Sequence, residues 1–342
     1  MIEFHETEDE QLLVETAKRF ADEHLLPLER EHEAARAFPA SLVSMYEELG
    51  FAHLGLPEEL GGIPVPMGIR IGVWAALAAG DPAAPMAMSP WALASSLAET
   101  PAGAALLESG EPGLITWGGE LQLDGDRVFG LIPWAPQPRA TWLVAVGKGW
   151  VRRIHVSSDS LAQRPCGLQA AGGLSMTLDG AASEPMGNGE LAAKMHSEMR
   201  LFAAAVALGA GRYSYEYSKN YAQERVVFGK PVAHHQAIAF QIADCASMLD
   251  GAALLLGAAA SRPDRHMEVA NAYLEVMSTV EHVADRGVQL LGGHGYLYDH
   301  PVEKRMRDIR ALACLYGGPA AARADAAVLI LDAPEPLEVC HD

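Results

Sequence analysis

The feature of this chain that most constrains its fold is that the spacing of its apolar residues changes twice. Residues 1–112 have helical spacing, residues 113–187 form short strand-like runs between clusters of glycine and proline, and residues 188–332 return to helical spacing. This order predicts an α+β protein with an N-terminal helical domain, a small and mostly antiparallel middle sheet, and a C-terminal helical domain. Residues 333–342 carry two prolines and form a tail.

Local signals mark where several of these elements begin and end. Thr7 and Glu10 have the spacing of a helix capping box, and Asp124-Gly125 is a hairpin signal between alternating segments. Pro263 separates two long helical segments, and Gly317-Gly318-Pro319 favours the start of a final helix, because proline suits a first turn. Steps of mostly three or four residues predict one apolar stripe on the second long helix, made of Val269, Tyr273, Val276, Val280, Val283 and Val288.

Charge and composition exclude some classes of partner. The chain has 25 basic and 44 acidic residues, and this net charge of −19 argues against nucleic acid or an anionic membrane as the main partner. The longest apolar runs, around Leu201–Gly211 and Ala252–Ala260, are too short to span a bilayer. The 13 histidines show no paired ligand spacing, so we expect no metal site.

The cysteines and the N-terminus predict the compartment. Cys166, Cys245, Cys314 and Cys340 show no CxxC spacing, so we expect free thiols in a reducing environment. The first residues are acidic and lack the apolar segment of a secretory signal. We therefore expect a cytoplasmic protein.

Three stretches at predicted helix ends are rich in glycine or charge. Glu224–Pro231 places charged side chains beside a turn. Gln289–Tyr296 has three glycines in four residues, which either let a ligand approach the backbone or make a sharp turn. Gly317-Gly318-Pro319 precedes a helix N-terminus, where free N–H groups suit a phosphate or a carbonyl, as at any helix start. Taken singly, these stretches leave both interpretations open.

Taken together, the motifs resemble those of the acyl-CoA dehydrogenase family. The C-terminal motifs stand in the family's order: Arg225–Pro231 (Arg-x-x-Phe-Gly-Lys-Pro), His235-Gln236, Gln289–Tyr296 and Pro301–Asp308. Leu54–Gly62 is similar to the signature of the family's N-terminal helical domain. The resemblance covers about residues 5–330. It implies the family's three-domain fold, with a four-helix bundle as the C-terminal domain.

The resemblance implies an FAD cofactor bound across a subunit interface. In the family, these motifs of one subunit hold the ADP half of a flavin whose ring lies in the neighbouring subunit. The residues implied here are Arg225 at the pyrophosphate, Phe228 packed on the cofactor, Gln236 and Gln289 as hydrogen-bonding amides, and Gly292 and Gly293 as backbone of close approach.

The family's catalytic base is missing from its common position. Family members remove the α-proton of a CoA thioester with the Glu of a Tyr-Glu-Gly-Thr motif, while flavin N5 takes the β-hydride. Aligned without gaps from Arg307-Asp308, Tyr316 stands in place of this Glu. Some members carry the Glu on an earlier helix, before an Arg that matches Arg200, a substrate-side residue; that position is Met199 here. Glu198 lies about 100° around the helix and would serve as base only with a local distortion.

The middle domain departs from the family in the same direction. Complete members grip the flavin ring with a Thr-Glu-Pro-x-x-Gly-Ser-Asp loop and a Trp-Ile-Thr strand. Here Ile115–Gly119 runs almost at once into Glu120–Gly125, so the resemblance implies that the loop is deleted. Trp134 matches the family Trp, but Pro136 stands where a Thr hydroxyl would reach flavin N5.

These losses predict a subunit that works with a complete homologous partner. The chain resembles the base-less subunit of the heterotetrameric (α2β2) acyl-CoA dehydrogenases of sterol side-chain degradation. We therefore expect an oxidoreductase subunit that acts on CH–CH groups of an acyl-CoA substrate, with an electron-transfer flavoprotein as acceptor. Two alternatives stay open. One is a stand-alone flavoenzyme with another base or with lyase or oxidase-type chemistry; the other is a non-catalytic CoA-ester-binding or scaffold subunit.

Overall fold

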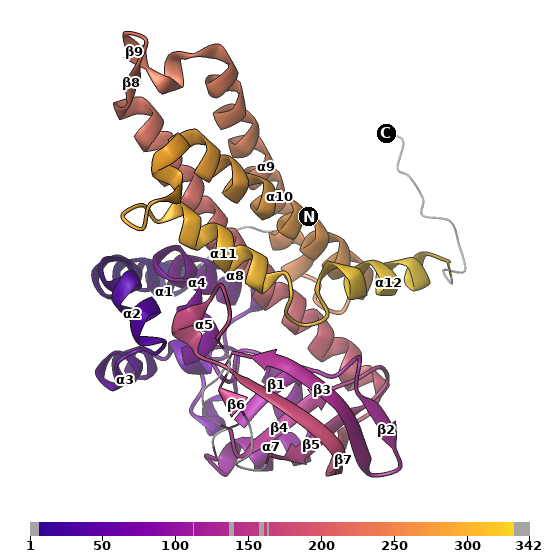
Figure 1. Ribbon diagram of the computed structural model, residues 1–342. Helices are drawn as coiled ribbons and strands as arrows, with labels where there is room; N and C mark the ends of the chain where they lie inside the picture. The colour runs from indigo at the N-terminus through magenta and orange to yellow at the C-terminus, as the bar shows by residue number, and fades with distance from the viewer. Residues whose placement is uncertain (1–6, 112, 137–139, 157–160, 163, 332–342) are drawn as a thin grey trace.

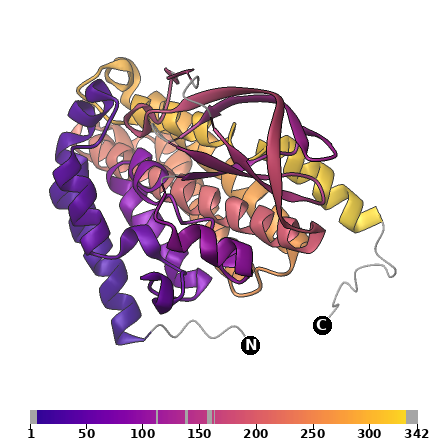
Figure 2. The same ribbon diagram turned by 90° about the horizontal axis from the view of Figure 1, so that it is seen from below.

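The protein has the predicted α+β fold, with helices before and after one sheet (Figure 1). The computed structural model describes residues 7–111, 113–136, 140–156, 161–162 and 164–331. The predicted tail at 333–342, with Cys340, lies outside these residues. Seen from below in Figure 2, the N-terminal helices and the strands lie on different sides of the long C-terminal helices.

Seven short helices form the N-terminal region: α1 (Glu8–Phe20), α2 (Glu29–Ala35), α3 (Ala40–Glu48), α4 (Met67–Gly80), α5 (Ala83–Met88), α6 (Ser95–Ala98) and α7 (Pro101–Glu108). The predicted capping box starts α1: the Thr7 hydroxyl accepts the Glu10 N–H at 3.3 Å, and the Glu10 carboxylate accepts the Thr7 N–H at 2.8 Å. Phe20 at the end of α1 packs edge-on against Tyr46 and Phe51, with ring centroids 5.8 Å apart in both pairs. These rings fix α1 over α3.

The middle region is a single sheet of seven strands: β1 (Gly113–Trp117), β2 (Gln122–Asp124), β3 (Arg127–Ala135), β4 (Trp142–Val146), β5 (Val151–His155), β6 (Leu161–Ala162) and β7 (Leu174–Gly187). The strand order is β1-β4-β5-β7-β3-β2, with β6 on β7. All pairs are antiparallel except β1 with β4. The predicted hairpin at Asp124-Gly125 is confirmed, because Asp124 pairs with Arg127 across β2 and β3.

The C-terminal region is built on α8 (Gly189–Glu224), α9 (Gln236–Ala260) and α10 (His266–Leu291), followed by α11 (Val302–Leu312) and α12 (Gly318–Leu331). Helix α8 packs between α4 and α10. A methyl group on Gly209 would lie 2.1 Å from the Ala75 carbonyl oxygen, so only glycine lets α8 and α4 approach this closely. The apolar stripe predicted on α10 is confirmed: its six side chains are all buried.

Helix α9 corrects the expectation that no apolar segment is long enough to cross a bilayer. Among the described residues, this one helix, of 25 residues, meets the length and composition of a membrane span. Its charged residues are Asp244 and Asp250, so the apolar segment is longer than the uninterrupted run at its C-terminal end. A helix of a protein interior or an interface meets the same criterion, and α9 packs on α8 and α10 of the bundle.

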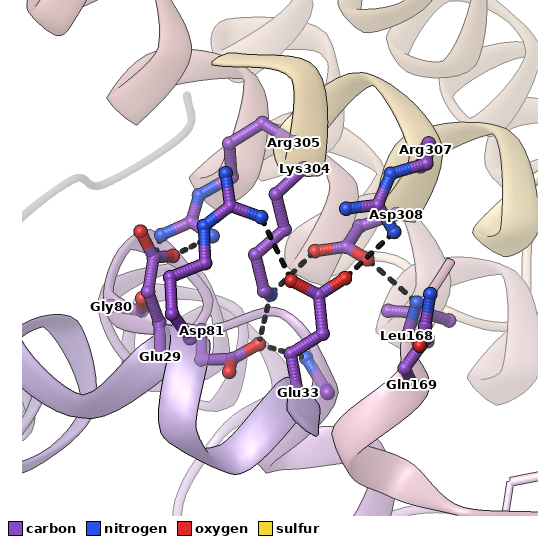
Figure 3. Close-up of polar contacts among 12 residues, drawn as sticks. Glu29, Glu33, Gly80, Asp81, Leu168, Gln169, Lys304, Arg305, Arg307 and Asp308 are labelled. Atoms are coloured by element: carbon purple, nitrogen blue, oxygen red, sulfur yellow. Dashed lines mark hydrogen bonds and ion pairs between the residues drawn. The ribbon is translucent and has the colours of Figure 1, made fainter. Parts of the chain in front are cut away.

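A buried group of charges ties the three regions together (Figure 3). The Lys304 ammonium of α11 donates to Asp81 at 2.9 Å and to Asp308 at 2.8 Å, and all three side chains are fully buried. The second Asp308 oxygen accepts the Leu168 N–H of the middle region at 2.6 Å. Beside them, Arg305 pairs with Glu29 of α2 at 2.6 Å. The sequence analysis treated Lys304, Arg305 and Asp308 as parts of one motif, and did not predict that they meet Asp81 and Glu29 inside the protein.

Candidate functional site

A cavity of about 250 Å³ lies between the sheet and the turn that joins α11 to α12. The short connection 118–121 between β1 and β2 forms one wall, and β3 forms another. Its lining includes Thr116, Trp117, Glu120, Pro133, Trp134, Pro136, Tyr316 and Gly317. The structure thus brings Trp134, Pro136 and Tyr316 to one chamber, together with Trp117 and Glu120, whose role the sequence analysis missed. Their position in and beside the short connection between β1 and β2 was the available signal.

Tyr316 supplies a neutral phenol to this chamber. Its backbone is left-handed, with φ of 52°, which costs a residue with a Cβ about 1–2 kcal/mol. The Tyr316 side chain is half-buried, and this burial raises the pKa of its phenol; the neighbouring Tyr273 raises it further. Tyr316 therefore keeps its proton at neutral pH and does not replace a carboxylate base.

Glu198 points into the protein and is absent from the lining of the 250 Å³ chamber. One carboxylate oxygen accepts hydrogen bonds from the Ser95 hydroxyl and from both the backbone N–H (3.0 Å) and the hydroxyl (2.8 Å) of Ser96. Burial raises the Glu198 pKa, and the two serines and Arg70 oppose this rise. The carboxylate joins α8 to α6 of the N-terminal region.

Arg200 and Trp134 have protein partners of their own. The buried Arg200 guanidinium pairs with Asp325 of α12. The Trp134 indole N–H donates to the Gly172 carbonyl at 3.1 Å. The Trp134 ring also lines a second cavity, of about 390 Å³, on the side of Arg164 and Arg310. Trp134 is therefore a wall between two cavities.

The remaining predicted residues gather at the far end of the helical bundle, where hairpin β8 (Val226–Val227)–β9 (Lys230–Pro231) lies (Figure 1). Arg225 ends α8, Gln236 begins α9, and Gly292 follows the last turn of α10. The Tyr221 hydroxyl meets His294 Nδ1 at 2.7 Å and holds the glycine turn against α8. Sequence segments about 60 residues apart are thus brought to one surface.

This surface is open. Arg225, Gln236 and Gln289 are exposed, and Arg225 has no acidic partner in the part of the chain that the structure describes. The Phe228 ring is 93% exposed, on a left-handed backbone with φ of 53°. A Cβ added to Gly292 or Gly293 would meet no atom within 4 Å. Exposed aromatic, amide and guanidinium groups beside open backbone suit a large polar ligand.

Comparison with known protein families shows to which family a chain with this arrangement belongs. The family models "Acyl-CoA dehydrogenase, N-terminal domain" and "Acyl-CoA dehydrogenase, C-terminal domain" match residues 7–101 and 187–327. The chain belongs to the acyl-CoA dehydrogenase family. Members of this family are FAD-binding oxidoreductases that act on CH–CH groups.

Individual members of the acyl-CoA dehydrogenase family align over most of the chain. Benzylmalonyl-CoA dehydrogenase of Aromatoleum aromaticum is 26% identical over 366 aligned positions, covering 90% of this chain and 94% of that protein. Butyryl-CoA dehydrogenase of Megasphaera elsdenii shares the fold with a TM-score of 0.81 at 18% identity, over 96% of this chain and 100% of that one. A variant of the Tcur3481-Tcur3483 steroid ACAD has a TM-score of 0.78 at 21% identity, over 95% and 98%.

The residues of this family member fit one half of FAD better than the other. The open surface offers an unpaired Arg225, free amides and glycine backbone, which suit the pyrophosphate and adenosine. The chamber beside Tyr316 has aromatic walls for a flat ring. However, Pro133 and Pro136 have no N–H to donate to the polar edge of that ring.

Proposed function

We propose that this chain is a subunit of an FAD-dependent acyl-CoA dehydrogenase and that a homologous partner supplies the catalytic Glu and the flavin-ring pocket. The observation that carries the proposal is the neutral Tyr316 phenol at the position of the family's base. The chain's own contribution is the open surface around Arg225 and Gly292, which binds the ADP half of the partner's cofactor.

The proposed chemistry needs a base that the chain's own chamber lacks in suitable form. FAD, when bound, accepts the hydride that leaves the β-carbon of the acyl-CoA. A carboxylate must take the α-proton; Glu198 is held away from the chamber by Ser95 and Ser96, and Glu120, the carboxylate that lines the chamber, is exposed to solvent instead of being enclosed beside a substrate. The partner therefore supplies the base, and an electron-transfer flavoprotein is the proposed electron acceptor.

Two observations support a partner of the same family. Helix α9 presents exposed apolar side chains, Phe240, Leu254 and Leu255, and such a patch is typical of an interaction surface. The steroid ACAD among the solved relatives is named as a pair, Tcur3481-Tcur3483. Both are consistent with a hetero-oligomer.

The test is co-expression of the chain with homologous family members, followed by measurement of flavin per chain and of bleaching by acyl-CoA. We expect the chain alone to be inactive, and the correct pair to be yellow and active. Removing a general base costs roughly 10²–10⁴-fold in rate, so activity of the chain alone that equals that of the pair would refute the proposal. Pairs that stay colourless and inert would instead favour the scaffold alternative.

A second candidate function is a stand-alone flavoenzyme, and one observation favours it. Glu120 is a carboxylate that lines the 250 Å³ chamber. If the chain alone proves active, Glu120→Gln should lower the rate of that activity by about 10²–10⁴-fold. Glu198→Gln is the matched control from outside the chamber.

A further inference from the structure

A third cavity, of about 460 Å³, lies where the three regions of the chain meet. Helix α2 provides one wall, the turn after Leu168 in the middle region a second, and the segment between α10 and α11 the third. Its volume is within the range of small-molecule sites, about 300–1,000 Å³. It shares no lining residue with the chamber beside Tyr316.

The acidic side chains of this cavity are already neutralised. Glu33 pairs with Arg30 at 2.8 Å and with Arg307 at 2.7 Å. Glu303 pairs with the same two arginines, at 2.6 Å and 2.8 Å. The four side chains form a closed ring of ion pairs with no net charge. This part of the lining therefore leaves no charge for a ligand to neutralise.

Arg36 is a cationic side chain of the lining that takes no part in this ring of ion pairs. It lines the cavity, is half-buried and has no acidic partner among the described residues; its Nη1 is covered by protein atoms, so an anion in the cavity would meet the other guanidinium nitrogens. Arg36 ends α2 in a left-handed conformation with φ of 54°, where glycine is the usual residue. Such strain costs about 1–3 kcal/mol and is concentrated at functional sites.

The opposite wall is also set by a strained residue. Leu168 has φ of 53° and places Gln169 at the cavity. The Gln169 amide N–H donates to the Cys166 carbonyl at 3.2 Å, which leaves its carbonyl oxygen as an acceptor. Two non-glycine residues with left-handed backbone, Arg36 and Leu168, thus place the Arg36 and Gln169 side chains at this cavity.

Two tyrosines supply flat surfaces between these polar groups. The Tyr298 ring is held by Arg30, whose guanidinium carbon lies 4.3 Å from the ring centroid. The Tyr296 ring is 75% exposed. A flat ligand can therefore stack on an aromatic face while its polar groups meet Arg36 and Gln169.

We propose that this cavity binds a small molecule with a planar ring and one anionic group, a carboxylate or a phosphate. Arg36 pairs with the anion, the tyrosines stack on the ring, and the Gln169 oxygen accepts a hydrogen bond from the ring's edge. Arginine favours carboxylate and phosphate because its donors match their geometry. The proposal is separate from the dehydrogenase function proposed above, since none of these residues lines the chamber and none is among the six residues implied at the FAD, although Tyr296 ends the motif Gln289–Tyr296.

The test is calorimetric titration of the full chain with adenosine 5′-monophosphate and with phenylacetate. Binding with Kd below about 1 mM is expected for at least one of them, and the better probe distinguishes a phosphate from a carboxylate ligand. Adenosine and inorganic phosphate, which each lack one feature, should bind at least tenfold more weakly. Arg36→Gln should weaken the probe at least tenfold, and Tyr296→Ala, at an exposed position, provides a second variant with little effect on folding.

Arg164→Gln is the matched control, because Arg164 is an exposed arginine without an acidic partner among the described residues that lines the 390 Å³ cavity instead. It should leave binding unchanged. Arg225→Ala separates this site from the FAD surface: AMP binding that depends on Arg225 and not on Arg36 would overturn the proposal and leave the dehydrogenase function intact. The absence of binding by either probe, or binding that is unchanged in both Arg36→Gln and Tyr296→Ala, would also overturn it.

Discussion

At the scale of single residues, Tyr316 determines which protonation state the chamber offers at neutral pH. Because burial raises its pKa above the usual value of about 10, the phenol stays protonated at neutral pH and cannot serve as a general base. We predict that Tyr316→Phe in the co-expressed pair changes kcat/KM by less than about tenfold, against roughly 10²–10⁴-fold for loss of a base. The pH profile of the pair should not move; a displaced basic limb would show that the hydroxyl takes part in proton transfer.

The variant Tyr316→Glu tests whether a catalytic base is all that the chain's own chamber lacks for dehydrogenation. We predict that the chain with this change alone stays inactive, because Pro133 and Pro136 still offer the ring no N–H donor. The measurement is acyl-CoA-dependent reduction of a dye by the purified chain supplied with FAD. Turnover would mean that the chain's own chamber holds a working flavin.

Arg225 is the residue of the open surface for which charge makes the clearest prediction. A hydrogen bond to a charged group contributes about 1.5–3 kcal/mol, so Arg225→Ala should weaken FAD retention by the pair by about ten- to a hundredfold. Flavin retained after gel filtration measures the effect. Arg212→Ala is the control, since Arg212 lies on the same helix but pairs with Asp250 at 2.9 Å. Equal flavin retention in both variants would remove Arg225 from the site.

At the scale of elements, α11 is fixed in place by its buried charges. Burial is the largest single effect and opposes ionisation of both Lys304 and Asp308, but the attractions and hydrogen bonds within the buried group together outweigh it, so the Asp308 pKa is lowered and the Lys304 pKa is raised. Lys304→Met would leave Asp81 and Asp308 without their cation. We predict a loss of about 3–5 kcal/mol in the free energy of unfolding, measured with urea.

The exposed pair Arg212–Asp250 provides the control for this element, and Arg212→Met should cost less than about 1 kcal/mol. Because the Asp308 pKa is lowered on folding, its contribution to stability is complete above about pH 4 and is lost as the pH falls through the folded-state value. Similar losses in the two variants would mean that the buried group contributes no more than a surface pair.

The same elements show what a single sequence can predict. Periodicity identified the buried stripe of α10, and the capping pattern identified the start of α1, because both depend on residues close in sequence. The meeting of Asp81, Leu168 and Lys304 depends on packing between distant segments, which no local pattern encodes. For the same reason the sequence named Tyr316 and Trp134 but not Trp117, which only the fold brings beside them.

At the scale of the whole molecule, the exposed face of α9 needs an explanation that the single chain does not provide. Phe240 and Leu254 are 14 residues apart, which places them on the same side of the helix, and they are 59% and 63% exposed. Gly251, between them, has open space beyond its Cα, so another helix can approach closely. A long apolar face that the chain leaves open, beside the open Arg225 surface, suits a partner that covers both.

This face gives the prediction that tests the assembly directly. Leu254→Lys puts a charge in the proposed interface, where burial without a partner is unfavourable, and should dissociate the co-expressed pair in analytical ultracentrifugation while the chain stays folded. Leu12→Lys is the matched control, because Leu12 on α1 is 57% exposed and lies far from α9 in the sequence. Since α9 also has the length of a membrane span, binding of the wild-type chain to lipid vesicles is the competing outcome. A pair that is unaffected by Leu254→Lys, with vesicle binding that the same change abolishes, would assign this face to a membrane instead of a subunit.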